Sequence, residues 1–168
     1  MSRVSLCLFG SSPVRVDGRP HRLAISGATE RLFQYLLIHA GREIRREYLA
    51  DLFWRGTAPR RQRSAFNSAS WRIKNQLAEL PGLEIVSQGS TVALAVAPEV
   101  RIDAHELTDR VHEASNHAAL DAETVGRLQN ILEACDAPFM DGVTADWVLT
   151  ERERLFNLSV RGWCILMH

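Results

Sequence analysis

The chain has 168 residues, and its 20 Lys and Arg balance 20 Asp and Glu, so the formal net charge is zero. A hydrophobic fraction of 46% and a charged fraction of 24% are typical of globular proteins and exclude a mainly disordered chain. No apolar run approaches the ~18 residues that a membrane span needs, and the N-terminal apolar stretch is too short for a signal peptide. We therefore expect a cytoplasmic protein of one or two domains, without membrane partners, with Cys7, Cys135 and Cys164 as buried free thiols.

The charges are unevenly distributed along the chain. Residues 1–98 hold 14 Lys and Arg and 7 Asp and Glu, a difference of +7, whereas residues 99–168 hold 6 and 13, a difference of −7. Six cations and no acid lie between Trp54 and Gln76. A solvated helix face usually mixes both signs, so this window favours an anionic partner. The split predicts two modules with different partners.

A small antiparallel sheet is predicted for the first 25 residues. Apolar residues recur at a two-residue spacing on both sides of a break at residues 10–13, which indicates two short strands. Asp17-Gly18 is a hairpin turn signal, and residues 21–25 predict a third strand.

Three helices are predicted next. The first has about 12 residues, begins after Ser26 and is ended by Gly41. An extended piece near Ile44 precedes the second helix, over residues 46–53. The third, over residues 60–80, carries one apolar stripe, formed by Phe66, Ala69, Ile73 and Leu77.

A β-hairpin follows these helices. Residues 83–86 and 91–96 are apolar and flank a polar tip. Two helices joined by a short turn and followed by a hairpin are typical of a winged helix-turn-helix.

Only helices are predicted after Pro98. Asp103 and Glu106 have the spacing of a capping box at the start of one helix, and Asp121 opens the next. A long last helix is expected over residues 144–167.

Motifs of enzymes and of metal or nucleotide sites are absent from the sequence. His105 and His112 are two helical turns apart, too far for one ion on a straight helix. Asp146, Glu151 and Glu153 are interpreted as the exposed face of an amphipathic helix. We therefore expect no catalytic residue, no metal and no cofactor.

The face of the third helix opposite its apolar stripe has residue types that suit DNA. Arg and Lys contact phosphates or guanine edges, Asn can read adenine, and Ser is a short donor. The candidate residues on this helix are Arg60, Arg61, Arg63, Ser64, Asn67, Ser68, Trp71, Arg72 and Lys74. Trp71 is expected at the boundary of the core, with a base or sugar contact as the alternative. The hairpin tip has no cation, so Ser90 and Thr91 would contribute only weakly.

The order of several segments resembles the SARP-type bacterial transcriptional activators, in which an OmpR-type winged helix precedes a bacterial transcriptional activator domain. The segments that carry the resemblance include YLADLFW at 48–54, WRIK at 71–74 and DWVLTERERL at 146–155. The resemblance implies sequence-specific binding to double-stranded promoter DNA, often as a homodimer, and recruitment of RNA polymerase. It places Arg63, Asn67, Trp71, Arg72 and Lys74 on the recognition helix.

This sequence departs from the family pattern in two ways. Ser68 and Ser70 stand where the family usually has β-branched residues. The helical part is also short, so we expect an incomplete activator domain whose apolar faces need further helices or a partner.

The predicted fold class is α+β. A winged-helix DNA-binding domain with an N-terminal antiparallel sheet is expected over residues 1–97, and an all-α, TPR-like activator segment over residues 98–168. The predicted function is sequence-specific transcriptional regulation, by activation. The alternative is a winged-helix adaptor that binds proteins and not DNA.

Overall fold

The structure is a computed structural model that describes residues 3–10, 13–117 and 119–167. Ser11 and Ser12, in the break between the first two predicted strands, lie outside the described residues. The chain divides into two compact units. Met1–Val4 and Val16–Val100 form the winged-helix unit, and Ser5–Arg15 and Arg101–His168 form the helical unit. The described part contains no helix long and apolar enough to cross a membrane.

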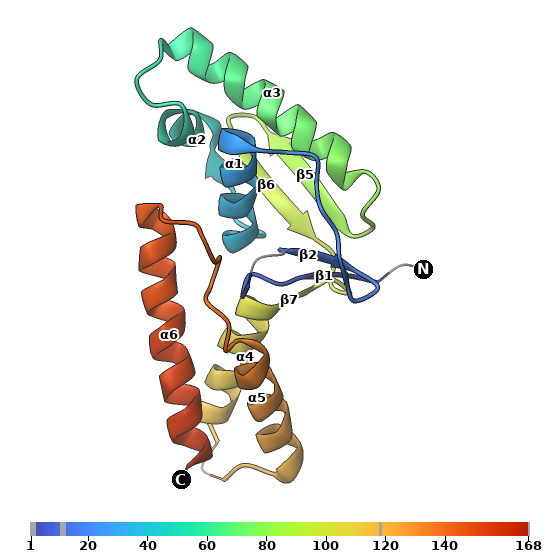
Figure 1. Ribbon diagram of the computed structural model, residues 1–168, viewed down its shortest axis with the longest axis vertical. Coiled ribbons are helices and arrows are strands. Elements are labelled where there is room, and N and C mark those ends of the chain that lie inside the picture. The colour runs from blue at the N-terminus through green and yellow to red at the C-terminus, as the bar shows by residue number, and fades with distance from the viewer. Residues whose placement is uncertain (1–2, 11–12, 118, 168) are drawn as a thin grey trace. The chain divides into compact units, whose positions relative to one another are not determined.

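The mixed α and β architecture confirms the predicted fold class (Figure 1). The predicted division after residue 97 lies close to the change of unit after Val100. The prediction gave residues 5–15 to the first domain, however, whereas they pack within the helical unit. The domain assignment itself stays a prediction.

The N-terminal sheet has four strands in the order β3-β2-β1-β7. Their bounds are β1 Val4–Leu6, β2 Val14–Val16, β3 Arg19–Pro20 and β7 Arg101–Ile102. Asp17 and Gly18 both have positive φ, 51° and 79°, as a tight turn of two left-handed residues requires, so the predicted hairpin turn is confirmed.

Two predictions for this sheet are wrong. Residues 21–25 form no strand, and the Ala24 N–H donates to the Gln76 Oε1 at 2.6 Å instead of joining a ladder. The sheet is also not purely antiparallel, because β1 pairs with β7 in parallel, Ser5 opposite Arg101. Local sequence patterns cannot predict that β1 pairs with β7, because the two strands are far apart in the sequence.

The winged-helix unit contains three helices and a second sheet. The helices are α1 Gly27–Ile38, α2 Arg46–Phe53 and α3 Pro59–Leu77, and the strands are β4 Ile44–Arg45, β5 Leu83–Gln88 and β6 Thr91–Val96. The sheet order is β4-β6-β5, with antiparallel pairs. The three helices and the hairpin are therefore confirmed, with α3 ending at Leu77 instead of residue 80.

The packing of α3 fixes which side of this helix faces solvent. Phe66, Ala69, Ile73 and Leu77 are buried, as the predicted stripe requires. They pack towards α1, α2 and β5, which all contact α3 (Figure 1). Complete burial of a Phe, Ile or Leu side chain contributes ~1.5–3 kcal/mol, so α3 cannot rotate about its axis without losing several such contributions.

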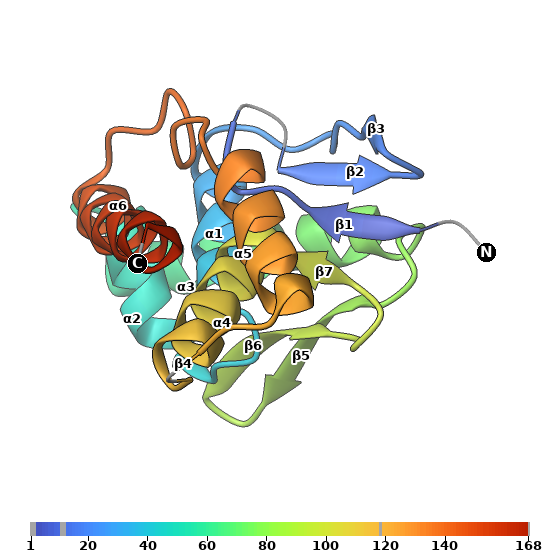
Figure 2. The same ribbon diagram turned by 90° about the horizontal axis from the view of Figure 1, so that it is seen from below.

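The helical unit is a bundle of three helices. α4 Asp103–Ser115, α5 Ala122–Ala134 and α6 Asp146–Leu166 pack against one another in all three pairs (Figure 2). Gly162 lets α6 approach α5 closely, because a Cβ there would lie 2.9 Å from the Leu132 Cδ2. Asp121 caps α5 by accepting the Thr124 N–H at 2.7 Å, as predicted.

The predicted capping box on α4 is wrong. Asp103 is the first residue of α4, and its carboxylate accepts the Leu8 and Phe9 N–H groups at 2.9 and 3.1 Å. It thereby ties the N-terminal segment to the helical unit. Burial raises the pKa of Asp103 above its usual range, although these bonds act in the opposite direction. Glu106 pairs with Arg101 instead.

The cysteines only partly follow the expectation of buried thiols. Cys135 is buried, and that burial raises its pKa far above the usual range. Cys7 is half-buried and Cys164 is exposed. All three are free thiols, and the exposure of Cys164 corrects the prediction, because it lies on the outer side of α6.

Replacing Gly82 by Ala should destabilise the winged-helix unit much more than replacing Gly56. Both glycines have a φ of +86°, which costs a side chain about 1–2 kcal/mol. A Cβ on Gly82 would lie 2.6 Å from the Val100 Cγ2, whereas nothing lies within 4 Å at Gly56. Overpacking adds ~1–3 kcal/mol for Gly82→Ala alone. Urea unfolding of both variants measures the difference, and equal losses would contradict this packing.

Candidate nucleic-acid interface

The candidate interface is the outer face of α3, which follows α2 after a short turn. The structure leaves exposed Arg60, Arg61, Arg63, Ser64, Asn67, Ser68, Trp71, Arg72 and Lys74. All nine predicted helix residues therefore reach solvent. Asn75 is also exposed and lies about one turn beyond Trp71 and two beyond Ser68 on the same face; the sequence prediction omitted it. At the wing, Ser90 is exposed and Thr91 is half-buried.

Trp71 lies in solvent and not at the boundary of the core. Its relative exposure is 65%, compared with 2% for Phe66 on the buried side of the same helix. The expectation of a core-boundary residue is therefore wrong. Trp71 lies nearly opposite the apolar stripe, where the helix has no neighbour to cover an indole ring.

The cations of α3 are free of ion pairs. Within the described residues, Arg60, Arg61, Arg63, Arg72 and Lys74 form no side-chain hydrogen bond or ion pair, and α3 contains no acidic residue. The helix therefore presents a strip of uncompensated positive charge. Such a strip attracts anions, and a polyanion most strongly.

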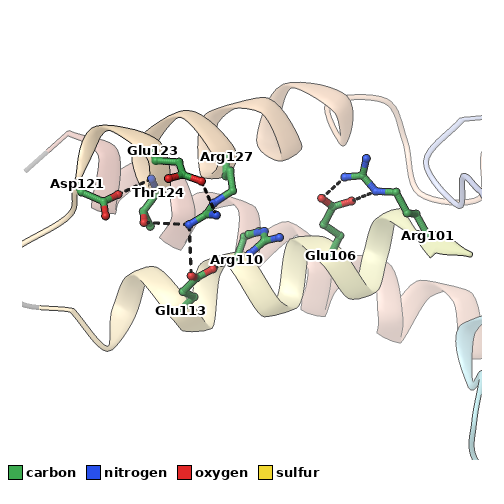
Figure 3. A network of polar contacts seen from close by, with 8 residues as sticks. All are labelled: Arg101, Glu106, Arg110, Glu113, Asp121, Glu123, Thr124 and Arg127. Carbon is green, nitrogen blue, oxygen red and sulfur yellow. Dashed lines mark hydrogen bonds and ion pairs between the residues drawn. The ribbon is translucent and has the colours of Figure 1, made fainter. Parts of the chain in front are cut away.

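In the helical unit, by contrast, most of the cations are paired with carboxylates (Figure 3). Arg110 pairs with Glu113 at 2.8 Å, and Arg127 lies 3.7 Å from Glu113 and 3.0 Å from Glu123. The hydrogen bond from Arg110 is the main cause that holds the pKa of Glu113 below its usual value. The positive charges of this unit are thus largely neutralised within it, whereas the five cations of α3 are not.

Asn67 accepts a hydrogen bond from Arg46, a residue that the sequence analysis did not select. The Arg46 Nη2 donates to the Asn67 Oδ1 at 2.8 Å. The Arg46 guanidinium also lies over the Phe66 ring, 5.6 Å from its centroid. Arg46 begins α2, 21 residues before Asn67, and only the folded helix pair brings the two together.

The wing tip offers little to an anion. The Thr91 hydroxyl lies 3.2 Å from the Glu43 Oε2 and 2.9 Å from the Gln88 carbonyl oxygen, so its proton is already used. The Glu43 carboxylate adds negative charge at this point. The weak role predicted for Ser90 and Thr91 stays a prediction.

A metal site is not formed by the described residues: no group of three or more His, Cys, Asp or Glu side chains could hold an ion. Over the same residues, His112 and His117 are exposed and His105 is half-buried. The chemistry of the α3 face is that of hydrogen-bond donors and positive charge.

Comparison with known proteins identifies the fold. No protein-family model and no curated protein matches the sequence. A solved structure of Mycobacterium tuberculosis EmbR, in complex with a low-affinity phosphopeptide, is similar with a TM-score of 0.75 over 97% of this chain, at 18% identity. The chain spans 44% of the length of that neighbour.

The similarity establishes the fold alone. EmbR is a transcriptional regulator of the SARP family, so the neighbour has the fold that the sequence resemblance implies. The predicted fold is thereby confirmed.

Trp71→Ala should leave stability almost unchanged, whereas Phe66→Ala should lower it strongly. An exposed side chain contributes little, within about 0.5 kcal/mol, but loss of a buried Phe costs ~3–5 kcal/mol. Thermal unfolding followed by circular dichroism compares the two variants. A large loss of stability for Trp71→Ala would contradict its exposed position and show that this side chain packs in the core.

Proposed function

We propose that this chain is a sequence-specific transcriptional regulator that binds double-stranded promoter DNA through the outer face of α3. The observation that carries the proposal is the strip of five unpaired cations on that face, interspersed with Ser64, Asn67 and Ser68. Arg and Lys neutralise phosphates, and the short polar side chains reach base edges in the major groove. The second helix of a helix-turn-helix pair is the element that enters this groove.

The position of the cations within α3 supports the proposal that this helix binds an external anion. Arg60, Arg61 and Arg63 lie in the first turns, where the positive end of the helix dipole disfavours cations. The N-cap is Ala58, which offers no side-chain acceptor, and the first turn contains no acid. This arrangement lowers the stability of the isolated helix, whereas a DNA phosphate beside the N-terminus would compensate both the charges and the dipole.

The helical unit is proposed to contact a protein, with activation through RNA polymerase as the proposed outcome. Its support is a row of large apolar side chains exposed on or just after α6: Leu149, Phe156, Val160, Trp163 and Met167. Exposed apolar patches of this kind mark interaction surfaces. Homodimerisation and a cytoplasmic location remain parts of the proposal.

The same apolar row favours a second candidate function, a winged-helix adaptor that binds proteins and not DNA. The cation-free wing tip, with Glu43 beside it, agrees with that candidate. The unpaired cations of α3 favour the regulator, because a strip of positive charge attracts a polyanion such as DNA most strongly. We therefore give preference to the regulator.

The binding of mixed-sequence duplex DNA at about 50 and 200 mM salt should distinguish the two candidates. A protein that binds several phosphates loses ~10³-fold or more in affinity over this range. Changing Arg60, Arg61 and Arg63 to Ala should flatten the salt slope by roughly one unit for each phosphate that is no longer neutralised. Fluorescence anisotropy measures both quantities.

The matched control removes three exposed cations from the helical unit, Arg101, Arg154 and Arg161. This variant has the same net charge as the α3 variant and should keep the salt slope of the unchanged protein. Equal slopes for the two variants would show that binding depends on net charge and not on α3. No binding at low salt would leave the adaptor as the better account.

A further inference from the structure

Arg46 and Asn67 form a preassembled pair at the edge of the α3 face. The bond between Arg46 Nη2 and Asn67 Oδ1 is 2.8 Å long. The Arg46 backbone is fixed as well, because its N–H donates to the Ser90 carbonyl oxygen at 2.9 Å. The cation–π contact of the guanidinium carbon, 5.6 Å from the centroid of the Phe66 ring, restrains the remaining side-chain torsions. The pair therefore exists before any ligand arrives.

The pairing fixes the orientation of the Asn67 amide. A guanidinium has five donors and no acceptor, so the amide atom that faces it must be the oxygen. The Asn67 Nδ2, with two donors, then points away from Arg46. A free asparagine can turn either end of its amide towards a base, whereas this one is held in a single orientation.

The pair as a whole is rich in donors. Asn67 contributes two N–H groups, and Arg46 keeps further N–H groups beyond the one used. The Oδ1 retains a second lone pair, but a positive guanidinium lies beside it and opposes the approach of another donor. In the major groove, guanine presents the acceptors O6 and N7, whereas adenine presents the acceptor N7 and the N6 donor.

We propose that Arg46 and Asn67 read DNA as one unit that selects guanine over adenine at one position of the operator. The proposal rests on the proposed function, because it assumes that α3 lies in the major groove. In this scheme Asn67 contacts the base, and Arg46 is a positioning residue that fixes the Asn67 amide and adds positive charge beside it. It reverses the adenine preference that the sequence alone suggests for an asparagine.

Selection from a randomised duplex library, followed by sequencing, tests the pair. The base position at which Asn67→Ala loses its preference defines the site that Asn67 reads. At that position the unchanged protein should favour guanine over adenine by about tenfold. Arg46→Met keeps an unbranched stem over Phe66 but frees the amide, so its preference should move towards adenine.

Arg45→Met is the matched control. Arg45 is exposed, precedes Arg46, and makes no side-chain hydrogen bond or ion pair with a described residue. Its loss removes the same charge from the same end of α2 without touching Asn67. The variant should therefore keep guanine at the site, at a lower overall affinity.

The possible outcomes separate this inference from the proposed function. Adenine selected by the unchanged protein at the Asn67 position, identical preferences for Arg46→Met and Arg45→Met, or no change on Asn67→Ala would each overturn the pair while leaving DNA binding in place. Failure of the unchanged protein to select any duplex would overturn both. Circular dichroism checks that Arg46→Met is folded. If it is not, the unchanged protein and Asn67→Ala still decide the base preference.

Discussion

Burial of one apolar stripe on α3 is the constraint on which the interface depends. Phe66, Ala69, Ile73 and Leu77 anchor the helix and set its rotation, with 2% or less of each side chain exposed. Every other position of α3 then has a fixed direction. The same packing that stabilises the winged-helix unit therefore determines which side chains are offered to a partner.

Charge placement separates the two units in the same way. The cations of the helical unit are largely satisfied by neighbouring carboxylates, whereas those of α3 have no acidic partner among the described residues. Exposed ion pairs contribute little to stability, at most about 1 kcal/mol each, so the difference has small consequences for folding. Its main consequence is electrostatic attraction between α3 and an anionic partner.

Much of the fold could be predicted because its signals are local. Residues close together in the sequence determine the apolar spacing of α1 to α3, the Asp17-Gly18 turn and the hairpin after α3. The errors arise where distant segments meet. The parallel pairing of β1 with β7 joins residues 5–6 to residues 101–102, and the Asp103 carboxylate accepts the N–H groups of Leu8 and Phe9 in addition to that of Ala104 in its own helix.

The candidate interface shows the same limit. Helical periodicity is sufficient to select the exposed cations of α3. It does not place Trp71 correctly, because large aromatic side chains are usually buried and this one is exposed. Arg46 was missed altogether, since nothing in the sequence connects it with Asn67 before α2 and α3 are folded together. Side-chain pairs of this kind become visible only in the folded chain.

The most direct test of the account is to map the backbone amides that respond to duplex DNA by nuclear magnetic resonance. The account predicts that the largest shifts fall on residues 60–75 of α3 and on Arg46, with small shifts at the wing tip and none along α4 and α5. Shifts confined to the helical unit, or an unchanged α3, would contradict the claim that this helix is the DNA-binding surface.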